Sequence, residues 1–241
     1  MVAMTDFDFI RHAHNTDGLG QYLHPIHKFG HNPALSGTAQ ESVWSAGGLY
    51  PWSAFDAGGQ NIFAKSDEGA DTGLLTIEGL DANYIKQVET KAMTGATAVQ
   101  FDNTFRRVHR MSYIGSANAG TITAHTVSGT GTVVAQIAEG VGQTQMAVYT
   151  IPAGYVGYLL NYTSSTGKND DATVQLYCRE EGESFQLKSE IKVFQNSFTQ
   201  SLYTGMRMPA KTDIDLQAIT TSAGSEIICN FDLIISGEDP A

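Results

Sequence analysis

The sequence predicts an all-β protein, and three observations lead to that fold class. From residue 73 onward, short runs rich in β-branched and aromatic residues are separated by turn residues at intervals of roughly 8–12 residues. Polar and apolar side chains alternate within several runs, as in antiparallel sheets that bury one face. After residue 40, no stretch of about ten residues has the periodicity of an amphipathic helix. We therefore expect two antiparallel β units that follow an extended N-terminal arm.

The first β unit is expected over residues 66–140, which are rich in Thr, Gly and Ala. Its predicted strands are Leu74–Leu80, Ile85–Lys91, Thr97–Phe101, Arg106–Ile114, Thr121–Val127 and Thr132–Ala138. The Gly-rich segment Glu139–Gly142 follows, and we place the boundary between the units there.

The second unit, residues 141–241, has longer runs and most of the aromatic residues of the two units. The predicted strands are Gln145–Ile151, Gly157–Ser164, Ala172–Arg179, Ser184–Leu187, Glu190–Phe194, Phe198–Leu202, Thr212–Thr220 and Glu226–Ile235. Alternation is clean at Asp213 and Asp215, which oppose Ile214 and Leu216. This number of strands in about 95 residues predicts a β-sandwich, of which a jelly roll is one form.

Residues 1–65 show neither helical nor strand periodicity, although they hold both tryptophans and many other aromatic residues. Such a segment is a poor match for a disordered tail, so we interpret it as an arm that becomes ordered on another chain. Its expected partner-binding anchors are Trp44, Leu49, Tyr50, Trp52 and Phe55. The alternative is that this segment folds back on its own domain.

Composition narrows the possible functions. Of the 241 residues 41% are hydrophobic and 16% charged, below the roughly 25% of an average soluble domain, which argues against disorder. Apolar runs are too short for a membrane helix, and the N-terminus lacks the pattern of a secretory signal, so we expect synthesis in a cytosol and no membrane partner.

The net charge of −11 makes nucleic acid a poor partner, because acidic surfaces repel phosphate backbones. A single basic cluster, expected to form a salt-bridged strand face, comprises Arg106, Arg107, His109 and Arg110. Cys178 and Cys229 lie in apolar runs without metal-binding spacing, so two buried thiols are expected.

One short string invites a catalytic interpretation. Phe9–Thr16 (FIRHAHNT) resembles the histidine phosphatase signature, which implies that His12 accepts phosphate and Arg11 holds it. Ala13 replaces the glycine of that signature, and the β-rich remainder does not match the α/β fold of that family. We expect no enzyme activity and no cofactor.

Two sets of residues offer metal-binding chemistry. One is the N-terminal histidine set, His12, His14, His24, His27 and His31, because neutral imidazole is a common ligand of transition metals. The other is a set of acidic and amide residues in two loops, whose oxygens could hold a calcium ion. It comprises Asp67, Glu68, Asp71, Asn169, Asp170 and Asp171. Polar contacts to a partner and solvated turns are the simpler interpretations, and we predict no metal site.

Three strings resemble uncharacterised structural proteins of tailed-phage virions from aquatic phages. They are Glu41–Trp52 (ESVWSAGGLYPW), Leu75–Tyr84 (LTIEGLDANY) and Tyr149–Gly154 (YTIPAG). The resemblance implies a non-enzymatic virion protein that is assembled in the host cytoplasm and contacts its own copies, the major capsid protein, or connector and tail proteins.

Within that class the preferred hypothesis is a multi-copy capsid decoration or cement protein that binds neighbours through its arm. A head–tail connector, or a tail or fibre component, is the alternative. A second alternative from another class is a carbohydrate-binding β-sandwich, in which Trp44, Trp52 or Tyr203 would stack on sugars.

Overall fold

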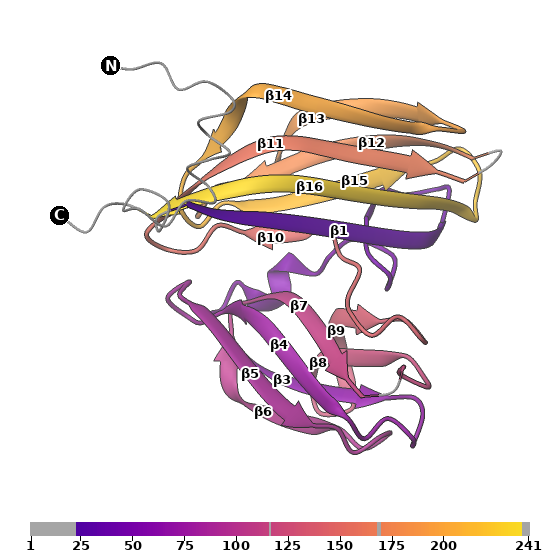
Figure 1. Ribbon diagram of the computed structural model, residues 1–241, viewed down its shortest axis with the longest axis vertical. Coiled ribbons are helices and arrows are strands. Elements are labelled where there is room, and N and C mark those ends of the chain that lie inside the picture. Colours follow the sequence, from indigo (N-terminus) through magenta and orange to yellow (C-terminus); the bar gives the residue numbers. More distant parts are fainter. Residues whose placement is uncertain (1–22, 116, 168–169, 238–241) are drawn as a thin grey trace.

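The computed structural model describes residues 23–115, 117–167 and 170–237, which form two β units joined at one junction (Figure 1). The predicted all-β fold class is confirmed, since every regular element of these residues is an antiparallel strand except the 3₁₀ turn Trp52–Phe55. No helix in the described part is long and apolar enough to cross a membrane.

The larger unit is a sandwich of two sheets. One sheet has the order β1-β16-β11-β14, with bounds Leu23–Leu35, Ser225–Gly237, Tyr155–Thr166 and Ser197–Met208. The other has the order β10-β15-β12-β13, with bounds Val148–Thr150, Asp213–Ile219, Asp171–Arg179 and Gln186–Phe194. A two-residue strand, β2 (Glu41–Ser42), pairs with β15 beyond the end of β10.

The strand order of this sandwich is that of a jelly roll. When its eight strands other than β2 are counted along the chain, one sheet places the first beside the last, and the other places the second beside the seventh. In this count the first sheet has the order 1-8-3-6 and the second has the order 2-7-4-5. This order corresponds to two Greek keys, which define a jelly roll. The predicted sandwich is therefore confirmed as a jelly roll.

The core of the jelly roll follows the predicted alternation. On β12 every second side chain is buried, from Ala172 to Cys178, and these pack against the opposite sheet at Leu159, Tyr162 and Phe231. Both cysteines are buried free thiols, as expected. Burial raises the pKa of Cys178 to about 12, so this thiol is unreactive at neutral pH.

The smaller unit is a seven-stranded β structure. One sheet has the order β6-β3-β8-β9, with bounds Val99–Phe105, Gln60–Ser66, Ile122–Val127 and Thr130–Ile137. The other has the order β5-β4-β7, with bounds Lys86–Ala92, Leu74–Leu80 and Arg107–Ile114. Side chains of β5 bond the backbone of β6, for example Glu89 to the N–H groups of Asp102 and Asn103, so the sheets meet along that edge.

This smaller unit is inserted into the jelly roll and does not precede it. The chain leaves the jelly roll after β2 and returns just before β10, and the two crossings are paired by the N–H of Ala147 donating to the carbonyl of Val43 at 2.9 Å. Both crossings pass over Gly30 of β1, where an added Cβ would lie 2.0 Å from the Val43 carbonyl oxygen. Only glycine allows that approach.

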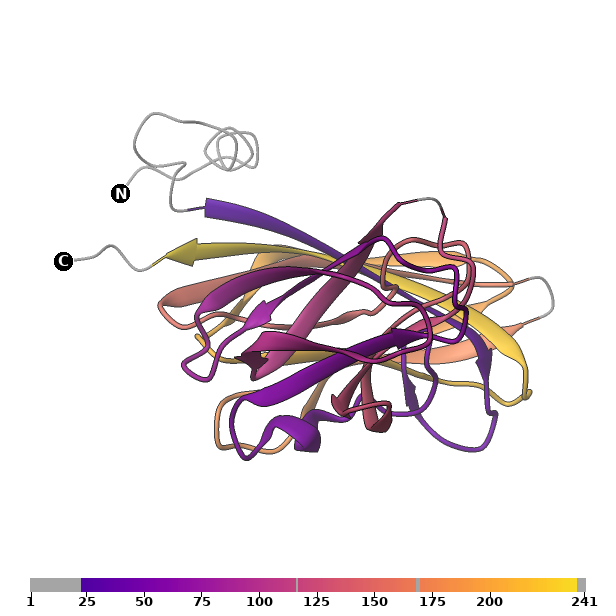
Figure 2. The same cartoon turned by 90° about the horizontal axis from the view of Figure 1, so that it is seen from below.

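The structure corrects the interpretation of residues 23–65 as an aperiodic arm. Residues 23–35 form β1, which pairs with β16 from Leu23 opposite Ser236 to Leu35 opposite Ser225 and runs beside it in Figure 2. Residues 60–66 form β3 of the inserted unit. The alternation of β1 was hidden because the inward positions after Ile26 are Lys28, Gly30 and Asn32, which face the junction and not an apolar core.

Most of the remaining predicted strands agree with the structure to within about four residues, but Phe198–Leu202 is less than half of β14 (Ser197–Met208), and two predicted strands merge. The predicted strands Ser184–Leu187 and Glu190–Phe194 fall largely in one strand, β13, which begins at Gln186 and whose register against β12 shifts between Leu176 and Tyr177. A β-bulge places an extra residue in one strand and interrupts its alternation. This local irregularity explains why the sequence predicts two strands there.

Candidate functional site: the junction between the two units

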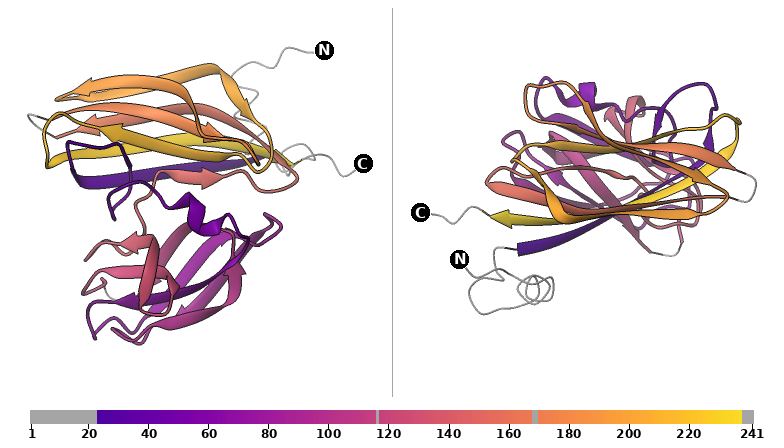
Figure 3. Two further views of the ribbon diagram at one scale, coloured as in Figure 1. Left: turned by 180° about the vertical axis from the view of Figure 1, so that it is seen from behind. Right: turned by 90° about the horizontal axis from the view of Figure 1, so that it is seen from above.

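The junction is built on one face of β15. Along this strand, Asp213 to Ala218 are all buried, although the sequence pattern assigns the aspartates to a polar face. The inserted unit and the crossing segment cover that face, and Figure 3 shows the short 3₁₀ turn in the space between the units. Asp213 and Asp215 are 2% and 0% exposed. Two carboxylates buried so deeply need specific partners.

Asp213 is the centre of a buried ionic cluster. The Arg107 guanidinium of β7 donates to it twice, from Nε to Oδ1 at 2.9 Å and from Nη2 to Oδ2 at 3.0 Å. Arg179 of β12 donates from Nη2 to Oδ2 at 2.6 Å, and the Thr150 hydroxyl of β10 donates to Oδ1 at 2.6 Å. Burial opposes charge on Arg107, but its bonds to Asp213 outweigh this and raise its pKa. The cluster ties three strands of the jelly roll to the inserted unit.

Asp215 anchors the crossing segment. Its Oδ2 accepts hydrogen bonds from the Trp52 indole, the Ser42 hydroxyl and the Gln217 amide, each at 2.9 Å. Its Oδ1 is buried and has no partner among the described residues. Burial, together with the nearby charge of Asp213, raises the pKa of Asp215 to about 6 despite these bonds. The Asp215 carboxylate therefore positions the Trp52 indole, but keeping this carboxylate ionised in a buried place costs free energy.

Aromatic rings surround the ionic cluster. The Arg107 guanidinium carbon lies 5.3 Å from the ring centroid of Trp52 and 5.6 Å from that of Tyr84. Arg179 lies 4.7 Å from the Phe185 ring, which contacts Trp52 at 5.6 Å. Cation–π contacts of this kind stabilise by about 2 kcal/mol when water is excluded. The rings hold both arginines in place and keep water from the ion pairs.

A second hydrogen-bonded chain extends from this cluster toward β1. The backbone N–H of Thr150 donates to Nε2 of His109 at 3.2 Å, so that nitrogen must be unprotonated. Burial and the neighbouring cations, Lys28 first among them, lower the pKa of His109 well below its usual value. The ammonium of Lys28 in turn donates to the His109 carbonyl. His109 is therefore a neutral structural residue.

The five anchors predicted from the sequence lie at this junction or beside it. Trp44, Tyr50, Trp52 and Phe55 are at most 7% exposed and pack in the core of the inserted unit, whereas Leu49 is 57% exposed. The sequence identified the right side chains but assigned them to another chain. They are core residues here because the segment folds back on its own units.

The basic cluster is used in three ways. Arg107 forms the ion pair with Asp213, as a salt-bridged face predicts. Arg106 stacks over the Tyr84 ring at 4.7 Å, and its Nε is buried without a partner among the described residues. His109 and Arg110 line a crevice on the side of β1. Of these residues, only Arg107 forms an ion pair within the described part of the chain.

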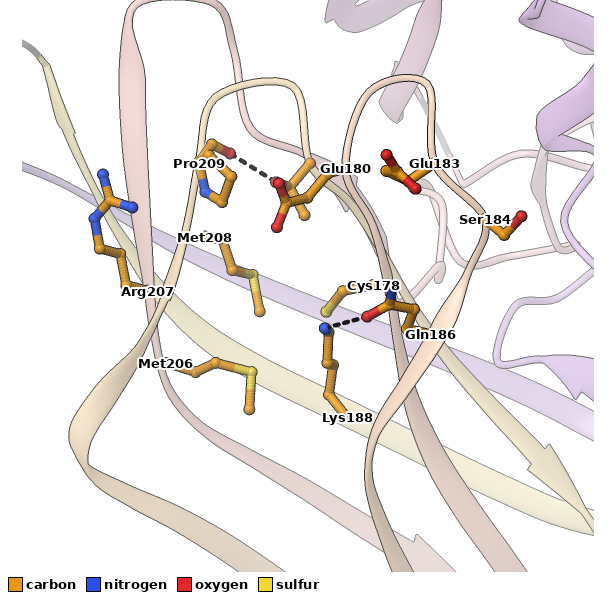
Figure 4. Close-up of a pocket in the computed structure, with 11 residues that line it drawn as sticks. Cys178, Glu180, Glu183, Ser184, Gln186, Lys188, Met206, Arg207, Met208 and Pro209 are labelled. Atoms are coloured by element: carbon orange, nitrogen blue, oxygen red, sulfur yellow. Dashed lines mark hydrogen bonds between the residues drawn. The ribbon is translucent and has the colours of Figure 1, made fainter.

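A separate cavity lies at one end of the jelly roll (Figure 4). It has a volume of about 480 Å³ between the β12–β13 and β14–β15 turns. Met206 and Met208 point into it from one side, Cys178 lies on the other side, and the Lys188 ammonium donates to the Gln186 side-chain oxygen. The lining residues include no aromatic ring. This does not favour stacking of sugars in the cavity.

The candidate metal ligands make other contacts in the described part of the chain. His27 and His31 bond Asp232 and Glu226 of β16 at 2.6 and 2.8 Å, and His24 packs edge-on against Tyr155.

The loop acids are used as backbone acceptors. Asp71 accepts from the N–H groups of Ala119 and Gly120, and Asp67 accepts from that of Thr121. No group of three metal-ligating side chains occurs within residues 23–115, 117–167 and 170–237. His12, His14, Asn169 and the FIRHAHNT string with Arg11 lie outside these ranges.

Sequence reasoning missed the partnership of Asp213 with Arg107 and Arg179. A signal was present, because two aspartates alternate with apolar residues in the middle of a strand of high β-propensity. Aspartates at such positions lie either on a face of the sheet that meets water, or on a buried face where cationic or hydrogen-bonding partners compensate them. The sequence alone does not say which, because the partners lie 34 and 106 residues away along the chain.

Comparisons with known proteins identify no family. No family model matches the chain, and no curated protein matches its sequence. Solved structures with some likeness include the Yersinia pseudotuberculosis-derived mitogen, with 14% identity, TM-score 0.20, and coverage of 39% of this chain and 87% of that one.

Virus particles are also among these structures. The infectious bursal disease virus Gx strain has 8% identity, TM-score 0.28, and coverage of 91% of this chain and 73% of that one. The VP2 subviral particle of that virus has 9% identity, TM-score 0.23, and coverage of 90% and 71%. Likenesses at these TM-scores carry no argument about function, and the strand order described above defines the fold.

Proposed function

We propose that this chain is a non-enzymatic structural protein of a tailed-phage virion, present in many copies as a capsid decoration or cement protein. The proposal is supported by the jelly-roll topology, which recurs in viral capsid domains as well as in lectins and cupins. Fold alone does not choose among these functions.

The observation that carries the proposal is the place of the three strings that resemble virion proteins. Each contributes a side chain to the junction: Trp52 bonds Asp215, Tyr84 lies under Arg107, and Thr150 bonds Asp213. The resemblance therefore falls on the residues that lock the two units together, although they are far apart in the sequence. A rigid block of two units suits a protein whose task is to hold neighbours in a fixed geometry.

The aromatic side chains Trp44, Tyr50, Trp52 and Phe55 are buried within the chain, so another surface must contact neighbouring proteins. The consecutive strands β13 and β14 are the outer strands of the two sheets, one in each, so unpaired backbone groups of both edges lie on one side of the jelly roll. Three aromatic side chains stand out there: Phe194, Phe198 and Tyr203 are 70%, 46% and 94% exposed. The opposite outer strand, β1, contains Pro25 and Pro33, which hinder strand addition.

Charge supports a second copy as the occupant of this edge. Residues 186–208 carry Lys188, Lys192 and Arg207 against the single acid Glu190, whereas the whole chain has a net charge of −11. The edge formed by β13 and β14 is thus complementary to the acidic surface of another copy. Strand addition combined with exposed aromatic anchors is a common mode of assembly.

The two alternative functions make different use of the same structure. A connector, tail or fibre component would use the same block in fewer copies. A carbohydrate-binding module would have to use Tyr203, because Trp44 and Trp52 are buried in the inserted unit. Glycan binding that is lost in Tyr203→Ser but unaffected by Phe194→Ser would favour that module.

The experiment that tests the proposal locates the protein in particles of the virus that encodes it. Cryo-electron microscopy of particles carrying a tagged copy should show the label at many regular capsid positions. Label at the portal vertex or tail would favour the alternative virion locations. Particles that lack the protein altogether would contradict a structural role.

The edge itself is tested by self-association of the purified chain. Phe194→Ser combined with Tyr203→Ser should abolish sedimentation of higher oligomers and leave the thermal unfolding midpoint unchanged. Val88→Ser, at a position 62% exposed on β5 of the inserted unit, is the matched control and should have no effect. Equal association of all three proteins would exclude the edge formed by β13 and β14 as the contact.

A further inference from the structure

A crevice with basic walls lies between β1 of the jelly roll and the inserted unit. Its volume is about 390 Å³, and its lining includes Lys28 from β1, Lys86 from β5, and His109 and Arg110 from β7. Glu78 of β4 is the acid that lines it. A concentration of cations is unusual in a chain of net charge −11 and calls for a physical reason.

Within residues 23–115, 117–167 and 170–237, the three cations of the crevice have no carboxylate partner. Lys28, Lys86 and Arg110 form no ion pair within the described part of the chain, where Lys91, Arg107, Arg179 and Lys211 all do. Glu78 lies opposite Arg110 in the β4–β7 register but forms no ion pair with it. The positive charge of this crevice is therefore only weakly balanced by the protein.

Lys28 is the most constrained of the three. It is only 5% exposed, and the hydrogen bond recorded for its ammonium among the described residues goes to the His109 carbonyl. An ammonium has three donors, so its hydrogen-bonding capacity is not filled. Burial, and next the charge of Arg110, lower the pKa of Lys28 to about 7, although Glu78 acts in the opposite direction. A buried cation of this kind is stabilised by an anion at hydrogen-bond distance.

The histidines near the crevice do not supply that anion or compete for it. His109 is neutral because its Nε2 accepts from the Thr150 N–H. His27 lines the crevice but is bonded to Asp232. His24 lies against Tyr155, and burial followed by repulsion from Lys86 lowers its pKa. The cationic donors that remain for a ligand are those of Lys28, Lys86 and Arg110.

We propose that this crevice is a binding site for a small tetrahedral oxyanion of the sulfate or phosphate class, held by Lys28, Lys86 and Arg110. Two ammonium groups and a guanidinium match an anion whose oxygens accept from several directions. The crevice lies between the units, so a bound anion bridges β1 to β5 and β7. This inference is independent of the virion role.

The test uses sulfate, because it keeps its charge across neutral pH. Isothermal titration of the purified chain with sodium sulfate, against sodium chloride of equal ionic strength, should show saturable binding and a raised thermal unfolding midpoint. Arg110→Gln and Lys28→Met should each weaken binding by about tenfold or more, the loss expected for one charge-assisted hydrogen bond. Lys65→Gln, which removes a charge on β3 that does not line the crevice, is the matched control and should bind normally.

Lys28→Met is expected to fold, since it replaces a buried charge by an apolar chain of similar length. If it does not fold, Lys86→Gln at an exposed position takes its place. Sulfate binding that survives Arg110→Gln and the lysine variant would place the anion elsewhere and overturn the proposal. The absence of saturable binding in the unmodified chain would overturn it as well. Parallel titrations with phosphate and acetate separate tetrahedral oxyanions from simple carboxylates.

Discussion

The two faces of β15 are both buried, yet they use opposite chemistry. Ile214 and Leu216 pack into the apolar core of the jelly roll, whereas Asp213 and Asp215 face the inserted unit and bond arginines, hydroxyls and the Trp52 indole. The apolar face can be filled by many side chains of suitable volume. The ionic face accepts only partners with the right donors in the right places. We infer that the first face stabilises the jelly roll and the second sets the orientation of the inserted unit.

The largest effect is expected from Asp213→Asn. This change leaves the buried Arg107 guanidinium, and the largely buried one of Arg179, without their shared counter-charge, which costs about 3–5 kcal/mol of unfolding free energy. Urea unfolding of the two proteins measures the loss. The control is Glu190→Gln at an exposed position of β13, expected to change the free energy by no more than about 0.5 kcal/mol. A loss under about 1 kcal/mol for Asp213→Asn would remove the contrast between the faces.

Leu216→Ala probes the opposite face of the same strand. The lost burial and the cavity left behind should cost about 2–5 kcal/mol. Orientation of the units should survive, so in a Trp44→Phe background the Trp52 fluorescence maximum of the folded variant should match that of the Trp44→Phe chain. In Asp213→Asn, by contrast, we expect that maximum to move toward the red. Equal spectral shifts in both variants would mean that the two faces do not have separate tasks.

The pH dependence of stability tests the contribution of Asp215 to the ionic face of β15. Its pKa is raised from 3.8 to about 6 by burial and by Asp213, so the folded state binds the proton more tightly than the unfolded chain. Its contribution to stability is full below about pH 4 and is lost as the pH rises through about 6. Asp215→Asn should remove about 1–3 kcal/mol of pH dependence between those values, measured as the difference between two unfolding curves. Parallel pH profiles for the two proteins would contradict a raised pKa.

The smallest effect is expected for an ion pair on the outer surface. His27 bonds Asp232 across β1 and β16 at 2.6 Å, but both side chains are about half exposed. Exposed pairs of this type contribute little, so His27→Gln should change the unfolding free energy by less than about 1 kcal/mol. Thermal unfolding at pH 6 is a sufficient measurement. A loss as large as that of Asp213→Asn would show that burial is not what separates the two ion pairs.

The sequence predicts the strands well wherever one face meets an apolar core. The alternation from Ala172 to Cys178 became β12, and Leu74–Leu80 became β4 with the same bounds. β1 was missed for a physical reason, because Lys28 and Asn32 stand at inward positions that face a polar junction. Periodicity of hydrophobicity cannot find a strand whose buried face is polar.

The candidate site was only partly accessible from the sequence. Trp44, Leu49, Tyr50, Trp52 and Phe55 were predicted to be anchors buried on a partner chain; all but Leu49 are buried, but within this chain. Whether the surface they meet belongs to the same chain is a question of topology. Inserting one unit into another brings Trp52 to Asp215 across 163 residues, and no local pattern encodes such a separation.

The central claim is that the ionic face of β15 locks the inserted unit onto the jelly roll. The chain has two tryptophans, so two indole N–H signals are expected in a ¹⁵N-labelled sample, and Trp52 is assigned by Trp44→Phe. The Trp52 N–H donates to the buried Asp215 carboxylate at 2.9 Å. Hydrogen exchange of this proton should be slow and governed by the free energy of global unfolding, and it should become fast in Asp213→Asn. Fast exchange of the Trp52 indole in the unmodified chain would contradict a locked junction.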